Sequence, residues 1–222
     1  MATEVIYGRR PVAEAKRGRR RVLRVLTREQ HSEEELERRC GSPDHQGVIA
    51  EVEPYPYADP TSLLAGGAAL VLALDRVQDP RNLGAICRSA EVAGASGVVI
   101  PERHSAGVTA AACKASAGAV EHLPVARVRN LADWLAGAKD AGAWVYGADA
   151  GAETSYTSID YEGKVVLALG GEERGLRPRV AAACDVLVSI PQRGKVGSLN
   201  VGAAAAVLLF AARNLAEKGR GG

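Results

Sequence analysis

The chain has 222 residues, of which 47% are hydrophobic, 24% are charged and 4% are aromatic. This length provides for one substantial core and a small additional unit, and the share of charged residues excludes a wholly disordered chain. The formal net charge of +2 neither indicates nor excludes an acidic partner, so the distribution of charge along the chain matters more than its sum.

The N-terminus and the apolar stretches give no sign of export or membrane insertion. The first residues contain no charged segment followed by an apolar one, and the longest apolar run, residues 201–212, is too short to span a bilayer. The four cysteines, at positions 40, 87, 113 and 184, form no C-x-x-C pair. We therefore expect a cytoplasmic protein with no membrane partner and no metal, whose cysteines are small buried side chains.

The segment of residues 9–28 is strongly basic. It contains one acidic residue, Glu14, and these basic residues: Arg9, Arg10, Lys16, Arg17, Arg19, Arg20, Arg21, Arg24 and Arg28. Such a cluster on a near-neutral protein predicts contact with the phosphate backbone of a nucleic acid. A solvated helix face with scattered arginines is the alternative interpretation.

A proline-rich segment divides the chain. Residues 53–60 contain three prolines and continue neither a helix nor a central strand. We therefore predict a small unit at residues 1–54, ending in a strand-like run at 47–52, then a linker at 55–69 and a larger domain at 70–222.

Strand-like and helix-like segments alternate in the larger domain. Short apolar runs predict strands at 70–74, 97–100, 123–128, 143–146, 165–169 and 186–190. Helical spacing predicts helices at 83–93, 108–119, 131–141, 176–184 and 198–218. This alternation predicts an α/β fold, with a parallel sheet covered by helices on both faces.

Three loops after predicted strands are unusually polar or rich in glycine, and ligands of open α/β sheets bind at the carboxyl ends of strands. In the first loop, Asp79 and Asn82 are both able to cap the following helix. Arg88 lies six residues after Asn82, so the two side chains need not share a helix face. A capped helix with a surface arginine is the simpler interpretation of this loop.

In the second loop, Gly170 and Gly171 precede Glu172 and Glu173. Two glycines at a strand end allow a ligand to approach the backbone closely, and the two acids disfavour an anionic ligand. The loop is compatible with a cationic ligand such as the sulfonium centre of S-adenosylmethionine. A tight turn without a ligand is the alternative.

The third loop runs from residue 190 to the final helix, which we expect to open with Ser198 and Asn200. The free N–H groups at a helix N-terminus attract polar ligands. An ordinary N-cap by Ser198 is the alternative interpretation, and it is compatible with a function in binding.

Together, the three loops resemble the signature motifs of the SpoU family of RNA 2′-O-methyltransferases, within the SPOUT superfamily. The N-x-G-x-x-x-R-x-A signature is matched by Asn82, Gly84, Arg88 and Ala90. The L-G-x-E-x-x-G-L signature is matched by Leu169, Gly170, Glu172, Gly175 and Leu176. The signature that begins I-P and ends S-L-N-V is matched by Ile190, Pro191, Ser198, Leu199, Asn200 and Val201.

The resemblance covers roughly residues 70–213 and extends weakly to the front of the chain. Residues 6–8 and 45–49 are similar to landmarks of the substrate-binding domain in bacterial enzymes that methylate a guanosine of 23S rRNA. The resemblance therefore implies a small α+β RNA-binding domain before a methyltransferase domain with a C-terminal trefoil knot. It also implies a homodimer, S-adenosyl-L-methionine as cofactor, and an RNA substrate.

The resemblance assigns roles to particular residues. Gly170, Gly171, Ile190 and Leu199 would bind the cofactor, and Asn82, Ser198 and Asn200 would position the ribose and the loop. The family's usual assignment makes Arg88 the base that deprotonates the ribose hydroxyl. Because a guanidinium effectively does not deprotonate in proteins, Arg88 is alternatively a phosphate clamp. Glu172 is then the rival base, if burial raises the pKa of its carboxyl.

Two other functions are alternatives to this one. A nicotinamide-dependent enzyme requires a glycine-rich turn after the first strand of the domain, and residues 75–84 contain a single glycine. An RNA-binding protein without activity is disfavoured because every motif residue is present. Among RNA substrates, the front landmarks favour ribosomal RNA, and transfer RNA remains the alternative because the front segment is short.

Overall fold

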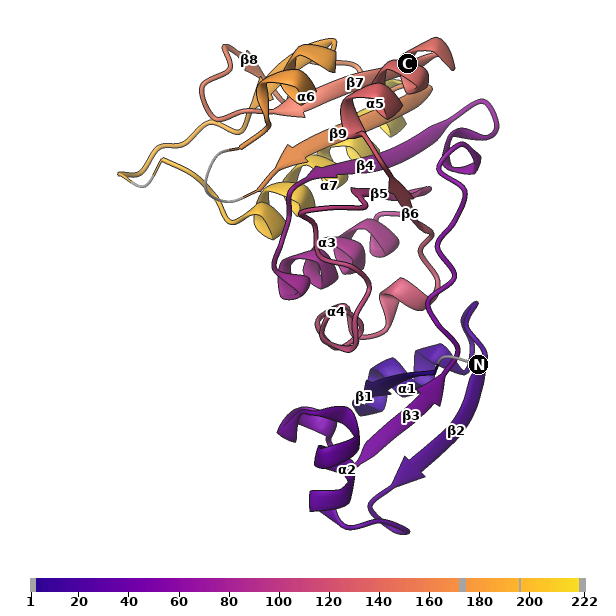
Figure 1. Cartoon of the computed structure of the whole chain (residues 1–222). Helices are drawn as coiled ribbons and strands as arrows, with labels where there is room; N and C mark the ends of the chain where they lie inside the picture. The colour runs from indigo at the N-terminus through magenta and orange to yellow at the C-terminus, as the bar shows by residue number, and fades with distance from the viewer. Residues whose placement is uncertain (1–2, 172–174, 196, 220–222) are drawn as a thin grey trace.

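The computed structural model describes residues 3–171, 175–195 and 197–219. Its strands form a three-stranded sheet in the order β1-β3-β2 and a seven-stranded sheet in the order β6-β5-β4-β9-β7-β10-β8 (Figure 1). The first sheet comes from the N-terminal part of the chain, and the second sheet holds all strands that follow the proline-rich segment.

The N-terminal sheet is antiparallel and packs one of its faces on a short helix. Its elements are β1 (Glu4–Tyr7), α1 (Arg9–Ala15), β2 (Val22–Thr27), α2 (Glu33–Cys40) and β3 (Val48–Val52). Helix α2 begins where the Ser32 side chain accepts a hydrogen bond from the Glu35 backbone, and it ends at the left-handed Gly41. Leu36 of this helix is fully buried against Leu26 and Ile49 of the sheet.

Every pair of neighbouring strands in the large sheet is parallel, which confirms the predicted α/β fold. The strands are β4 (Ala69–Asp75), β5 (Gly97–Pro101), β6 (Val125–Val128), β7 (Ala143–Ala148), β8 (Thr154–Ser155), β9 (Lys164–Gly170) and β10 (Val186–Ser189). The helices are α3 (Pro80–Val92), α4 (Ala110–Ala115), α5 (Leu131–Asp140), α6 (Pro178–Ala183) and α7 (Val201–Gly219).

Central strand β4 shows why the sheet is covered on both faces. Leu70, Leu72 and Leu74 point into the core beneath α3 and α7, whereas Val71 and Ala73 point into the core beneath α5 and α6. Figure 1 shows these two helix pairs on opposite sides of the sheet. A strand that is buried on both sides is apolar on both faces, which explains the continuous apolar run of residues 69–74.

The core beneath α3 and α7 continues into the N-terminal sheet. It includes Ile6 of β1, Ala50 and Val52 of β3, and Tyr55 of the proline-rich segment. That segment runs beside edge strand β6, where Ala58 forms a parallel bridge with Ala126. The two sheets are therefore joined by continuous apolar packing.

Several predicted boundaries were wrong for local reasons. The helix expected at 108–119 is shortened to α4, because Ala117 and Gly118 adopt left-handed conformations before a 3₁₀ helix at Ala119–Glu121. Helix α3 begins at Pro80, earlier than expected, because Asp79 caps it and proline is well suited to the first turn. Strand β8 is too short to be recognised from sequence. Among the described helices, none is long and apolar enough to cross a membrane.

Candidate active site

A cavity of about 380 Å³ opens at the carboxyl ends of β7, β9 and β10, beside the first turn of α7. Its lining is apolar around a few polar groups and consists of Ala148, Asp149, Ala150, Leu169, Gly170, Gly171, Gly175, Val188, Ile190, Gln192, Ser198, Leu199, Val201 and Ala204. All four residues predicted to bind a cofactor, Gly170, Gly171, Ile190 and Leu199, therefore border a single cavity.

The glycines of the second motif are required by the packing of the backbone. A Cβ atom on Gly170 would collide with the backbone of Gly175, and one on Gly171 would lie 2.6 Å from the carbonyl oxygen of Arg76. The Gly171 amide donates to the carbonyl oxygen of Asp75 at 2.8 Å. The sequence analysis predicted the close approach of a ligand to these glycines, and the structure shows that neighbouring segments of the chain also approach them closely.

Asp75 holds this loop in place, a role that the sequence analysis missed. Its carboxylate is fully buried at the end of β4 and accepts hydrogen bonds from the Arg177 backbone at 2.9 Å and from Nε of Arg177 at 2.8 Å. Nη2 of Arg177 completes an ion pair at 2.7 Å. An acid directly after an apolar strand is the signal that indicates such a role, because a buried carboxylate requires partners.

The first and third motifs meet through their asparagines. Nδ2 of Asn200 donates to Oδ1 of Asn82 at 3.2 Å. Oδ1 of Asn200 accepts from the Gly202 amide at 2.9 Å, so Asn200 caps α7. The final helix begins at Val201 and not at Ser198 as predicted, and the alternative interpretation of Ser198 as its N-cap was wrong. Ser198 instead lies in the exposed segment before the helix and borders the cavity.

Arg88 lies on the solvent side of α3 and outside the lining of the cavity. At 3.6 residues per turn, six residues place it about 120° around the helix from Asn82. It forms no hydrogen bond or ion pair with any residue in the described part of the chain. Its guanidinium is therefore available to an external group. Glu172, the rival base, lies outside the described residues.

Asp149 and Gln192 border the cavity and were also missed by the sequence analysis. Asp149 follows β7, and its Oδ1 accepts from the Gly151 amide at 2.7 Å, which fixes the carboxylate at the rim. The position of Asp149 after a strand was the available signal, since the carboxyl ends of all parallel strands lie at one edge. A carboxylate at the rim of this cavity favours a ligand that carries positive charge.

The comparisons with known proteins agree with this geometry. The profile of the SpoU rRNA Methylase family matches residues 69–210, which include the whole large sheet and all three motifs. The chain belongs to the SpoU rRNA methylase family. This result confirms the resemblance predicted from the motifs.

Two bacterial relatives of this SpoU-family chain are similar in sequence. An uncharacterized tRNA/rRNA methyltransferase of Mycobacterium sp. (strain KMS) is 47% identical over 180 residues, which cover 79% of this chain and 57% of the relative. The putative TrmH family tRNA/rRNA methyltransferase YacO of Bacillus subtilis (strain 168) is 43% identical over 171 residues, which cover 75% of this chain and 69% of the relative. The match thus spans little more than half of the mycobacterial protein.

Solved structures of SpoU and rRNA methyltransferases share the fold. The SpoU methyltransferase AviRb from Streptomyces viridochromogenes, in complex with AdoMet, has a TM-score of 0.80 at 26% identity, covering 95% of this chain and 89% of that one. An AdoMet-bound rRNA methyltransferase from Sinorhizobium meliloti has a TM-score of 0.84 at 26% identity, and the match covers 96% of this chain and 87% of that one. The similarity thus includes the N-terminal sheet.

The structure corrects one member of the basic cluster in this SpoU-family chain. The other eight basic side chains of residues 9–28 are exposed, but Arg20 is 3% exposed. Its Nη2 pairs with Oε1 of Glu121, its Nη1 donates to Glu4 at 2.9 Å, and its guanidinium approaches Sγ of Cys113. Burial alone would lower the pKa of Arg20, but the hydrogen bond to Glu121 reverses the net direction and keeps it charged. Arg20 therefore joins the N-terminal part of the chain to the larger domain, at α4 and the 3₁₀ helix Ala119–Glu121, and is not available to RNA.

The cysteines divide into two groups. Cys87 and Cys113 are buried as predicted, and burial raises the pKa of each thiol to about 12. Cys40 and Cys184 are half-buried, so the prediction of full burial was wrong for them.

Proposed function

We propose that this chain transfers a methyl group from S-adenosylmethionine to a ribose 2′-hydroxyl of ribosomal RNA, with a guanosine of 23S rRNA as the favoured target. The observation that carries the proposal is the convergence of three distant motifs. The second and third motifs border one cavity, and the Asn82–Asn200 hydrogen bond joins the first motif to the third. Transfer RNA is the alternative substrate, since the curated relatives are named tRNA/rRNA methyltransferases.

The cavity fits S-adenosylmethionine in size and chemistry. Its volume lies within the range of small-molecule sites, and apolar walls with a few polar groups are typical of such sites. The backbone of Gly170, Gly171, Ile190 and Leu199 would hold the cofactor, and the Asp149 carboxylate suits a cationic sulfonium. The bound cofactor supplies an electrophilic methyl group. The AdoMet complexes of AviRb and of the Sinorhizobium enzyme support this assignment.

The protein must orient the ribose and receive its proton. An O–C bond forms as the S–C bond breaks, and the hydroxyl proton passes to a base. Ser198, Asn82 and Asn200 would position the ribose and the loop, and accurate positioning can supply up to about 7–11 kcal/mol. Arg88 is exposed and suited to clamp an RNA phosphate. We therefore assign the base to Glu172, which follows the cavity residue Gly171.

We further propose that the active protein is a knotted homodimer. Val92 on α3, Leu199 just before α7 and Phe210 on α7 are large apolar side chains that are exposed. Helices α3 and α7 pack side by side, so these side chains offer an apolar surface to a second copy. Residues 1–54 would serve as the RNA-binding unit, 55–69 as its connection and 70–222 as the methyltransferase domain, with a trefoil knot in its C-terminal part.

Two measurements test the proposed function. Calorimetry should show S-adenosylmethionine binding to the wild-type protein. Binding should be weakened by Asp149→Asn and unchanged by Asp133→Asn, which alters an exposed carboxylate of α5 outside the cavity. Mapping of 2′-O-methylation in 23S rRNA and tRNA, from cells with and without this gene, should reveal one lost site. A folded protein that binds no cofactor would be an RNA-binding protein without activity.

A further inference from the structure

A second hollow, of about 580 Å³, lies between the two sheets and apart from the cofactor cavity. We call it the Tyr57 groove. It is lined by Glu4, Val5, Pro54, Tyr55, Tyr57, Gly107, Val108, Thr109, Ala110 and Arg127. These residues come from β1, the proline-rich segment, the loop after β5, the first residue of α4 and the edge strand β6. The groove therefore exists only because the N-terminal sheet packs beside the large one.

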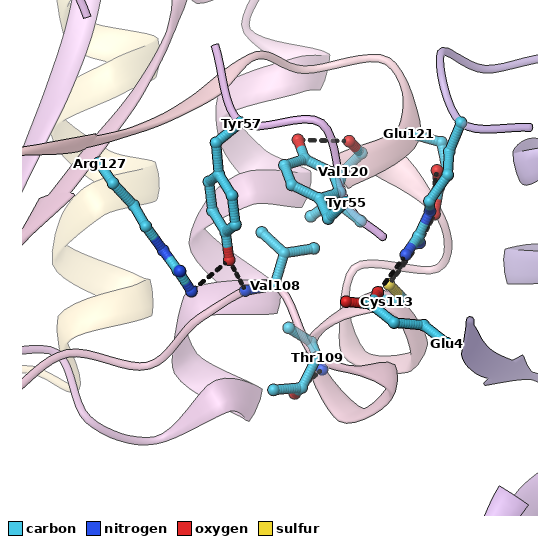
Figure 2. Close-up of polar contacts among 11 residues, drawn as sticks. Glu4, Tyr55, Tyr57, Val108, Thr109, Cys113, Val120, Glu121 and Arg127 are labelled. Atoms are coloured by element: carbon cyan, nitrogen blue, oxygen red, sulfur yellow. Dashed lines mark hydrogen bonds and ion pairs between the residues drawn. The ribbon is translucent and has the colours of Figure 1, made fainter. Parts of the chain in front are cut away.

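Stacked side chains line the groove (Figure 2). The guanidinium carbon of Arg127 lies 3.8 Å from the centroid of the Tyr57 ring. The ring of Tyr55 meets that of Tyr57 edge-on, with centroids 5.0 Å apart. The hydroxyl of Tyr55 is anchored to the carbonyl oxygens of Val120 and Leu123, both at 3.0 Å. The orientation of the Arg127 guanidinium is therefore set before any ligand arrives.

The groove presents hydrogen-bond donors that lack acceptors. The Tyr57 oxygen accepts from the Val108 amide at 3.0 Å and from Nη2 of Arg127 at 2.6 Å, so both of its lone pairs are used. Within residues 3–171, 175–195 and 197–219, no acceptor receives the Tyr57 proton and no carboxylate pairs with Arg127. The carboxylate of Glu4, which also lines the groove, is held by Arg20 at 2.9 Å.

The loop that closes the groove also borders the catalytic edge of the sheet. A Cβ atom on Gly107 would lie 2.5 Å from Nη2 of Arg127 and 3.0 Å from the Tyr57 oxygen, so the absence of a side chain leaves room for this pair. One residue earlier, the Ala106 amide donates to the carbonyl oxygen of Val77 at 2.8 Å. Val77 lies in the loop that leads to Asn82 in α3. The groove and the proposed active site are therefore connected through adjacent loops.

We propose that the Tyr57 groove binds a nucleotide of the substrate RNA, near the nucleotide that is methylated. Arg127 and the Tyr57 hydroxyl donate to its phosphate, and the apolar walls of Val5, Pro54 and Val108 contact its sugar and base. A cation and a free O–H group favour a phosphate, which is an anion with several acceptor oxygens. The identity of the partner as RNA rests on the proposed function, whereas its phosphate chemistry follows from the groove.

The test compares two groove variants with a control arginine, using filter binding to an unmodified 23S rRNA transcript. Arg127→Gln should raise the Kd about 10-fold, as expected for the loss of a charge-assisted hydrogen bond. It should also reduce the slope of log K against log salt by about 0.7–0.9, the value of one phosphate contact. Tyr57→Phe keeps the ring and should raise the Kd about 3-fold. Arg179→Gln, on α6, should leave both quantities unchanged, because Arg179 lies outside the groove.

The outcomes separate this inference from the proposed function. Each variant is first shown by circular dichroism and urea unfolding to fold like the wild type, which excludes misfolding. An Arg127→Gln protein with wild-type RNA affinity and salt slope overturns the groove proposal, even where methylation is observed. A wild-type protein that binds RNA but neither binds the cofactor nor methylates overturns the proposed function. Weaker RNA binding by Arg127→Gln would still support the groove in that case.

Discussion

The substitution Arg20→Met removes a buried cation and leaves behind the carboxylate that it neutralises. The side chain of Glu121 is 0% exposed. Its carboxylate accepts hydrogen bonds from Nη2 and Nε of Arg20, the second at 3.2 Å. Glu4, the other carboxylate, is 43% exposed and keeps access to water. The expected loss in unfolding free energy therefore arises mainly from Glu121.

Removing one partner of a buried ion pair typically costs about 3–5 kcal/mol. That loss is a large part of the roughly 5–15 kcal/mol that stabilises a typical domain. For a chain of this size it corresponds to a decrease in Tm of roughly 6–20 °C. The neighbouring Arg21 provides the control, because its side chain is 76% exposed and lies 3.9 Å from Glu53. Arg21→Met should cost about 0–1 kcal/mol.

Urea unfolding followed by circular dichroism measures these differences in unfolding free energy. The urea concentration at the midpoint should shift, while the slope m of the free energy against urea concentration stays unchanged. A third protein, Arg20→Met combined with Glu121→Leu, removes both buried charges and should recover much of the lost stability. The reasoning is refuted if Arg20→Met is as stable as Arg21→Met. It is also refuted if the double variant is no more stable than Arg20→Met alone.

Three further predictions concern RNA, catalysis and the cofactor loop. Changing the exposed Arg19 and Arg21 to Glu should weaken RNA binding and flatten its salt dependence, and an unchanged slope in filter binding would remove both from the interface. If Arg88 clamps a phosphate, Arg88→Lys should retain activity with a raised KM for RNA, whereas Glu172→Gln should lower the single-turnover rate roughly 10²–10⁴-fold and abolish the acidic limb of the pH–rate profile. A near-normal rate for Glu172→Gln would instead assign the base to Arg88. Asp75→Asn should raise the Kd for S-adenosylmethionine about 10-fold, because it weakens the pairing that holds Arg177 next to the second motif, and unchanged affinity in calorimetry would contradict that role.

Local sequence was sufficient to predict the α/β fold and the family. Strand β4 is apolar at six consecutive positions because both of its faces are buried, and this property is visible without any knowledge of its neighbours. The three motifs were recognised as segments, since each is contiguous in the chain. Boundaries were predicted less well where a single backbone conformation decides them, as at Ala117 and Gly118.

The tertiary structure decided which polar residues pair with which. Arg20 belongs to a basic run and looked like its neighbours, but its partner Glu121 lies 101 residues away. The same holds for Asp75 with Arg177, 102 residues apart, and for Tyr57 with Arg127, 70 residues apart. Periodicity reports whether a side chain faces a core, because that depends on local geometry. It cannot report the partner of a buried charge, because that partner is brought close only when distant strands and loops pack together.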